Sequence, residues 1–238
     1  MSPVLAIVII FFFATFTQSV SGFGGALVAM PLLTAGILPL EVAAPLFALG
    51  AIASRPFMLL RYRSALSLNQ IWRVLIAAVI AIPLGVELPR IMDEQIIRTV
   101  LAVVVIGYVL MNLMLEHLPK LNHTLWGWGL GFIGGLLAGA YNIGGPPVVI
   151  YATGRRWLAN EFRANMQTYS IINNVVVILA HARLGNLTPD VFQYFVLIIP
   201  SLAVGLLLGF ALNNHINQAL FRKLVLALLF VSGVRLLF

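Results

Sequence analysis

The sequence predicts an all-α polytopic membrane protein, and three observations support that prediction. Hydrophobic residues make up 61% of the 238 positions and charged residues only 9%, with a mean hydropathy of +1.04. A soluble domain carries about 25% charged residues. Apolar runs of membrane-spanning length recur along the chain, and a helix satisfies its own backbone in hydrocarbon. Finally, two of these runs are interrupted by glycine pairs at matching positions.

The apolar runs predict about eight hydrophobic segments. They lie at about residues 3–37, 41–60, 74–89, 96–115, 125–153, 165–182, 191–212 and 218–238. The first and fifth are too long for single spans, so each is expected to be a glycine-broken re-entrant or split helix. The N-terminal run lacks a basic n-region and a clear cleavage site, so we expect it to be retained rather than removed as a signal peptide.

An offset of 120 residues relates the two halves of the chain. It superimposes the glycine pairs Gly24-Gly25 and Gly144-Gly145. The same offset aligns three more pairs: Glu41 with Glu161, Arg63 with Arg183, and Gly85 with Gly205. The charged matches carry most weight because charged residues are rare here. The pattern predicts a first membrane repeat at 1–118, a cytoplasmic linker at 119–123 and a second repeat at 124–238.

The distribution of basic residues favours inverted halves. If every segment crosses once, the 14 Lys and Arg residues divide evenly between the two sides. If each long segment enters and returns, ten face the cytoplasm: Arg55, Arg61, Arg63, Arg73, Lys120, Arg155, Arg156, Arg163, Arg222 and Lys223. Only Arg90, Arg98, Arg183 and Arg235 then lie outside. The positive-inside rule therefore predicts inverted repeats with both termini outside. The net charge of +7 is interpreted as a topology signal, and no nucleic-acid partner is expected.

The two glycine breaks are the first candidate binding site. Irregular backbone is tolerated at membrane depth only inside protein or beside a watery cavity, and paired broken helices are typical of transporter centres. The half-helices that follow begin with free N–H groups and partial positive charge, which suit an anion. The candidate residues are Ser21, Gly22, Gly24, Gly25, Tyr141, Asn142, Gly144, Gly145 and Pro146. Close helix packing through small residues is the alternative.

Polar residues inside apolar segments are the second group of candidates. Arg55 lies deeper than the loop arginines and suits an anion, with snorkelling to the interface as the alternative. Gln167, Ser170 and Asn174 share one helical face and are either oxyanion donors or helix–helix contacts. Glu41 and Glu161 are expected to stabilise helix N-termini, with proton coupling as the alternative. The four histidines are expected at the membrane interface.

The motifs SGFGGALVAMPLL (21–33) and AGAYNIGGPPVVIY (138–151) resemble those of the TauE/SafE family of sulfite exporters, also called the 4-toluene sulfonate uptake permease family. The likeness in length, segment number, repeat and both motifs covers nearly the whole chain. The resemblance implies transport of sulfite, sulfonates or related sulfur-containing anions across the bacterial inner membrane. It fixes neither the substrate nor the direction.

These features together predict an inner-membrane secondary transporter of small sulfur-containing anions that works by alternating access. Its expected partners are the anionic substrate, the lipid bilayer and a coupling proton or ion, and a homodimer is kept as an alternative assembly. A small-anion channel is the main alternative, and a structural membrane subunit is weaker because it leaves the breaks unexplained. A membrane-embedded enzyme is weaker still, because no HExxH, GxSxG, P-loop or acidic metal-binding cluster occurs. No catalytic residue, metal or cofactor is therefore expected.

Overall fold

The computed structural model describes residues 2–114, 119–213 and 215–237, and every regular element in these ranges is helical. The first half contains α1 (Pro3–Ser21), α2 (Gly25–Thr34), α3 (Leu40–Tyr62), the short 3-10 helix η1 (Arg63–Ala65), α4 (Leu68–Ile91) and α5 (Glu94–Met114). The second contains α6 (Leu125–Tyr141), α7 (Gly145–Gly154), α8 (Ala159–Arg183), α9 (Pro189–Leu212) and α10 (Gln218–Arg235). The predicted end of the first repeat, at 115–118, lies outside the described residues.

Both long apolar segments are split where the sequence predicts. The first break lies between α1 and α2, where Gly22 and Gly24 adopt the left-handed conformation with φ of 83° and 94°, which glycine adopts without strain. The second lies between α6 and α7, where Asn142 takes φ 58°, and asparagine is the next most tolerant residue there. The described residues thus form ten α-helices where eight segments were expected.

Five helices are long and apolar enough to cross a membrane, within the described ranges: 3–21, 40–65, 68–91, 95–112 and 189–212. The chain is therefore a multi-pass membrane protein. This measure does not confirm eight hydrophobic segments, and that number stays a prediction. The split helices α2 and α6 are shorter. The helix α8 has a buried polar stretch that includes Asn173 and Asn174, and α10 carries Arg222, Lys223 and Arg235.

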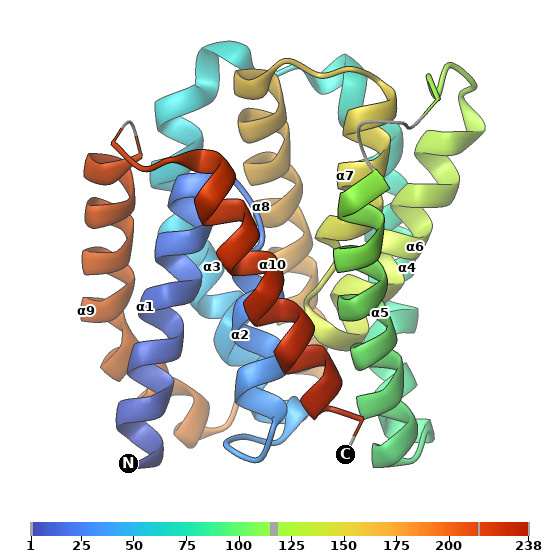
Figure 1. Cartoon of the computed structure of the whole chain (residues 1–238). Coiled ribbons are helices and arrows are strands. Elements are labelled where there is room, and N and C mark those ends of the chain that lie inside the picture. The colour runs from blue at the N-terminus through green and yellow to red at the C-terminus, as the bar shows by residue number, and fades with distance from the viewer. Residues whose placement is uncertain (1, 115–118, 214, 238) are drawn as a thin grey trace.

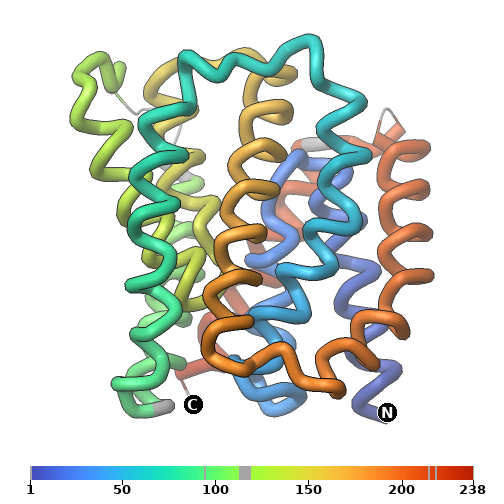
Figure 2. The backbone as a smooth tube through the Cα atoms, turned by 180° about the vertical axis from the view of Figure 1, so that it is seen from behind, coloured from blue at the N-terminus to red at the C-terminus, as the bar shows by residue number. Residues whose placement is uncertain are grey.

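The helices run in opposite directions in the two halves. Figure 1 shows both termini at the lower edge and the α5–α6 connection at the upper edge. From the lower edge, α1 rises and α2 returns, whereas α6 descends from the upper edge and α7 returns; the reversed view in Figure 2 agrees. This arrangement is the one that inverted halves require. The duplication, its boundaries and its orientation in a bilayer remain predictions.

Helix contacts correspond between the halves. The helix α1 packs on α9 as α6 packs on α4, while α3 packs on α8 and α5 on α10. Gly85 and Gly205, which the 120-residue offset pairs, lie at equivalent helix crossings. A Cβ on Gly85 would overlap the backbone of Leu136 in α6, and a Cβ on Gly205 would lie 2.8 Å from the Phe12 carbonyl in α1. Glycine at both positions lets the backbones approach closely, as in other membrane helix pairs.

The broken segments are enclosed by the other helices. In α2, the side chains of Leu27, Met30 and Leu33 are fully buried in the main apolar core, and in α7 Val148 is fully buried in a second apolar cluster. The irregular backbone at each break is therefore surrounded by protein, as backbone groups without helical partners require at membrane depth. Both breaks face the interior, where the candidate site lies.

Candidate functional site

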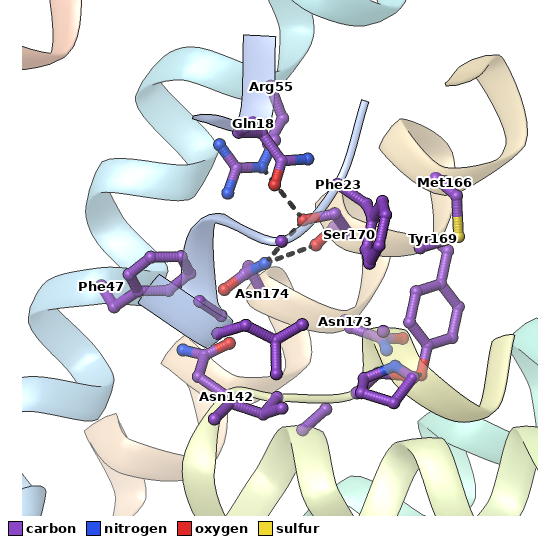
Figure 3. Close-up of a pocket in the computed structure, with 18 residues that line it drawn as sticks. Gln18, Phe23, Phe47, Arg55, Asn142, Met166, Tyr169, Ser170, Asn173 and Asn174 are labelled. Atoms are coloured by element: carbon purple, nitrogen blue, oxygen red, sulfur yellow. Dashed lines mark hydrogen bonds between the residues drawn. The ribbon is translucent and has the colours of Figure 1, made fainter. Parts of the chain in front are cut away.

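A small cavity lies between the two helix breaks. Its polar lining consists of Gln18, Arg55, Asn142, Tyr169, Ser170, Asn173 and Asn174, contributed by α1, α3, the second break and α8. Figure 3 shows these side chains gathered around one space. The cavity leaves about 60 Å³ for the centres of water-sized molecules, several times the roughly 10–15 Å³ that one water needs. A ligand of a few heavy atoms fits this space.

Arg55 is a buried cation in the wall of this cavity. Its exposed fraction is 3%. The Nε–H group donates to Ser170 Oγ at 3.3 Å and Nη1 donates to Ser54 Oγ at 3.1 Å. No acidic side chain among the described residues pairs with it, and two neutral hydroxyls do not neutralise its charge. Because the side chain points inward, it does not reach an exposed helix end, and the snorkelling alternative does not describe it.

The Arg55 guanidinium also lies beside the first turn of α2. A Cβ built on Gly25 would be 3.3 Å from Arg55 Nη2. The N-terminus of a helix carries about half a positive charge, so two sources of positive potential meet at this edge of the cavity. Such an arrangement repels cations and is stabilised by an anion.

The helix α8 contributes amide groups that have no partner in the described structure. Both polar side-chain atoms of Asn173 and the Oδ1 atom of Asn174 are buried without a hydrogen bond. The Nδ2 group of Asn174 donates to the Ser170 carbonyl at 2.7 Å and lies 3.2 Å from Ser170 Oγ. An unpaired buried polar group costs about 1–3 kcal/mol. These amides therefore point independently to a polar ligand or water in the cavity.

Gln18 fixes the geometry of the first break. Its Oε1 atom accepts the Gly25 N–H at 3.0 Å, and its Nε2 group donates to the Gly22 carbonyl at 3.1 Å. Gln167 donates to the same carbonyl at 2.6 Å. Gln18 lies seven residues before the N–H that it caps, and only the reversal of the chain brings the two together. No local pattern in the sequence indicates this contact.

The second break offers fewer backbone donors than predicted. Pro146 and Pro147 occupy the first turn of α7 and lack N–H groups. The Asn142 side chain donates to the Ala44 carbonyl at 3.0 Å, and the Tyr169 hydroxyl donates to the Gly144 carbonyl at 3.2 Å. Gln18 takes the first N–H of α2 and prolines remove two from α7, so side chains supply most of the donors, and anion binding by the two helix N-termini stays a prediction.

The structure gathers part of the predicted site. Eight candidates line the cavity: Gly24, Arg55, Asn142, Gly144, Gly145, Pro146, Ser170 and Asn174. Five lie outside its lining: Ser21, Gly22, Gly25, Tyr141 and Gln167. Their binding role remains a prediction.

The five residues outside the lining have other surroundings. Tyr141 belongs to the apolar core. Gln167 accepts a hydrogen bond from Gln18 of α1, a helix–helix contact of the kind given above as the alternative to a binding role. The Ser21 Oγ atom lies 2.6 Å from the carbonyl oxygens of Thr17 and Phe23. Sequence reasoning also missed Gln18, Tyr169 and Asn173 as lining residues. Asn173 was detectable, because it is an amide in an apolar helix next to Asn174.

The remaining ionisable candidates lie away from the cavity lining. Glu161 accepts the Leu158 N–H at 3.0 Å and so stabilises the start of α8, and Glu41 lies in the first turn of α3. His181 lies near the end of α8 as expected, but its side chain is 5% exposed, because it packs inward with Nδ1 at 2.9 Å from Asn186.

The whole chain is similar to one protein family. A family model described as sulfite exporter TauE/SafE matches residues 7–236. No curated protein and no solved structure matches the chain.

Proposed function

The chain belongs to the sulfite exporter TauE/SafE family, and from that premise we propose that it carries a small sulfur-containing oxyanion, sulfite or a sulfonate, through the cavity between the helix breaks. The observation that carries this proposal is Arg55. It is a buried arginine without an acidic partner in the described structure, and it faces a cavity large enough for such an ion.

The chemistry of the lining supports an oxyanion over a cation or a neutral solute. Arginine presents a planar fork of N–H donors that matches two oxygens of one anion. Placing an arginine at the centre of a bilayer costs about 2.5–3.5 kcal/mol on insertion scales. A bound anion offsets part of this cost, whereas a cation increases it. The unpaired Nδ2 group of Asn173 can donate to a further oxygen of the anion.

The site lies where the two halves of the chain meet, which supports alternating access. Arg55 belongs to the first half and Ser170 to the second, and their side chains are hydrogen-bonded across the α3–α8 contact. We propose that repeats 1–118 and 124–238 rock against each other about this contact, driven by an ion, proton or substrate gradient. We further propose a bacterial inner-membrane location with both termini outside, which places the basic linker in the cytoplasm.

Transport in proteoliposomes tests the proposal. Labelled sulfite and a simple sulfonate should enter with saturable kinetics and should exchange against unlabelled substrate inside. Phosphate and chloride serve as controls and should move much more slowly. Flux that neither saturates nor shows exchange would indicate a channel, and absence of flux for every anion would refute transport.

A further inference from the structure

A second, larger cavity adjoins the central one; we call it the vestibule. It leaves about 470 Å³ for the centres of water-sized molecules and lies among α1, α2, α5, α7, α8 and α10. Phe23, Gly24 and Leu27 line both cavities. The vestibule lies toward the edge of the molecule where α8 and α10 begin, which is the upper edge in Figure 1. An ion in the central cavity is therefore separated from the vestibule by the first helix break.

Arginines supply the charge in the vestibule lining. Arg156, Arg163 and Arg222 line it, and no acidic side chain does among the residues that the structure describes. Arg222 is held in place by Asn112, because its Nε–H donates to Asn112 Oδ1 at 2.7 Å and its Nη2 donates to the Asn112 carbonyl at 3.1 Å. Asn112 in turn donates to the Tyr108 hydroxyl at 2.7 Å. Among the described residues, the Arg222 guanidinium is thus oriented by neutral groups, which do not neutralise its charge.

Arg163, which α8 contributes to the vestibule lining, is fixed in a similar way. Its Nη1 donates to the Tyr62 hydroxyl at 3.2 Å, and the guanidinium carbon lies 5.3 Å from the centre of the Tyr62 ring. Its stem packs on the first break, since a Cβ built on Gly22 would lie 2.8 Å from Arg163 Cγ. These cations come from different helices and carry the same sign, so they concentrate positive potential in one cavity with apolar walls.

Phe23 forms the partition between the two cavities. It lies between Gly22 and Gly24, both in the left-handed conformation. Its ring makes edge-to-face contacts with Tyr108 at 5.8 Å and with Phe162 at 5.7 Å between ring centres. The aromatic cluster packs the break against α5 and α8, and Phe23 lines both the central cavity and the vestibule.

We propose that the vestibule is a second anion-binding site, which takes the same class of small oxyanion as the central cavity and holds it on the far side of Phe23. The identity of the anion rests on the proposed function, but the anion selectivity of the vestibule does not. Arg163 and Arg222, whose partners in the described structure are neutral, can bind oxyanions through charge-assisted hydrogen bonds. The ion would occupy the vestibule before or after it occupies the central site.

The absence of native cysteine allows a direct test. Val225 lines the vestibule, and in a Val225→Cys variant the rates of reaction with anionic and cationic methanethiosulfonate reagents are compared at low salt. The ratio of the two rates cancels the intrinsic reactivity of the cysteine, and dividing it by the ratio measured with a free thiol in solution cancels that of the reagents. A cavity lined by charges of one sign raises the local concentration of counter-ions by about tenfold or more. We expect the ratio to favour the anionic reagent by on the order of tenfold and methanesulfonate to slow its reaction.

Variants that neutralise the vestibule arginines test whether these arginines cause the preference for the anionic reagent. In the same background, Arg163→Gln with Arg222→Gln should remove most of the anionic preference. Lys223→Gln is the matched control, because Lys223 is exposed on the same helix and does not line the vestibule. If the double variant does not fold, Arg222→Gln alone should still lower the ratio, since it leaves Arg163 packed on Gly22.

The outcomes separate this inference from the proposed function. A rate ratio that stays the same in all variants overturns the vestibule site, even if sulfite flux is normal. Anionic preference with protection by methanesulfonate supports the vestibule site, even if no flux is found and the proposed function fails. Loss of the preference in Lys223→Gln as well assigns the effect to general surface charge and also overturns the site.

Discussion

Replacing Arg55 with glutamine should greatly weaken anion binding while leaving the fold intact. The substitution removes two long hydrogen bonds, to Ser170 Oγ at 3.3 Å and Ser54 Oγ at 3.1 Å. Because both bonds are long, each is assigned the lower end of the range for hydrogen bonds of charged groups, about 1.5 kcal/mol. The substitution also removes the cost of an arginine buried at membrane depth, about 2.5–3.5 kcal/mol. The two terms nearly cancel, so the melting temperature without ligand should change little.

The effect on affinity should be large. Removing one member of a buried, hydrogen-bonded charge pair costs about 2–5 kcal/mol, which raises Kd roughly thirtyfold to several thousandfold. In the wild type, an anion at about 100 times Kd stabilises the fold by about 2.7 kcal/mol. For a chain of this size that corresponds to a rise in melting temperature of about 5–11 °C. At the same anion concentration, the Arg55→Gln variant should keep at most about a third of this rise, and almost none of it at the upper end of the range.

The assay is thermal unfolding in detergent with and without sulfite, together with a direct measurement of Kd. Arg61→Gln is the matched control, because Arg61 lies on the same helix but is exposed and sits over the Phe210 ring at 4.7 Å. The control should keep the wild-type shift. If Arg55→Gln binds sulfite within about threefold of the wild-type Kd, Arg55 is a structural residue and the site assignment is wrong.

Three further predictions follow from the same geometry. Gly145→Val should abolish anion binding at an unchanged melting temperature, because the nearest atoms to a new Cβ are 3.8 Å away and the side chain would enter the cavity; retained binding would contradict this. Asn173→Leu should stabilise the ligand-free protein by about 1–3 kcal/mol, because it removes unpaired buried groups, and should weaken binding roughly ten- to hundredfold; lower stability at unchanged affinity would contradict a binding role. Single cysteines at Ser64 and Leu158 should be labelled from one side of the membrane and one at Gly185 from the other, and opposite labelling of the first two would refute inverted halves.

The helix breaks were predictable from the sequence because their cause is local. Glycine pairs within apolar runs leave few alternatives to a break, and the offset of 120 residues pairs the two. Arg55 was also predictable, since a charge inside an apolar run has to find a polar environment. The rest of the site depends on which helices meet. The roles of Gln18 and Tyr169 arise from contacts across the break and between α8 and the α6–α7 connection.

The two glycine pairs were expected to behave alike, and the structure separates them. A Cβ on Gly145 would make ordinary van der Waals contact, at 3.8 Å from Met166 and Phe23, whereas one on Gly25 would lie 2.9 Å from the Ala14 carbonyl and 3.2 Å from Gln18 Oε1. Gly25 therefore serves close packing of α2 on α1, and Gly145 borders the cavity. A valine at Gly25 should lower stability as well as affinity. Sequence equivalence could not reveal this difference, because it depends on the helix packed against each glycine.

The position of a bound anion tests the central claim most directly. Selenite has the shape and charge of sulfite, and selenium scatters anomalously, so its site can be located in crystals of the protein grown with it. We predict an anomalous peak in the cavity between Arg55 and Asn173, with its oxygens within hydrogen-bonding distance, about 2.7–3.2 Å, of the Arg55 guanidinium. A protein that binds selenite with no peak in this cavity would contradict the account.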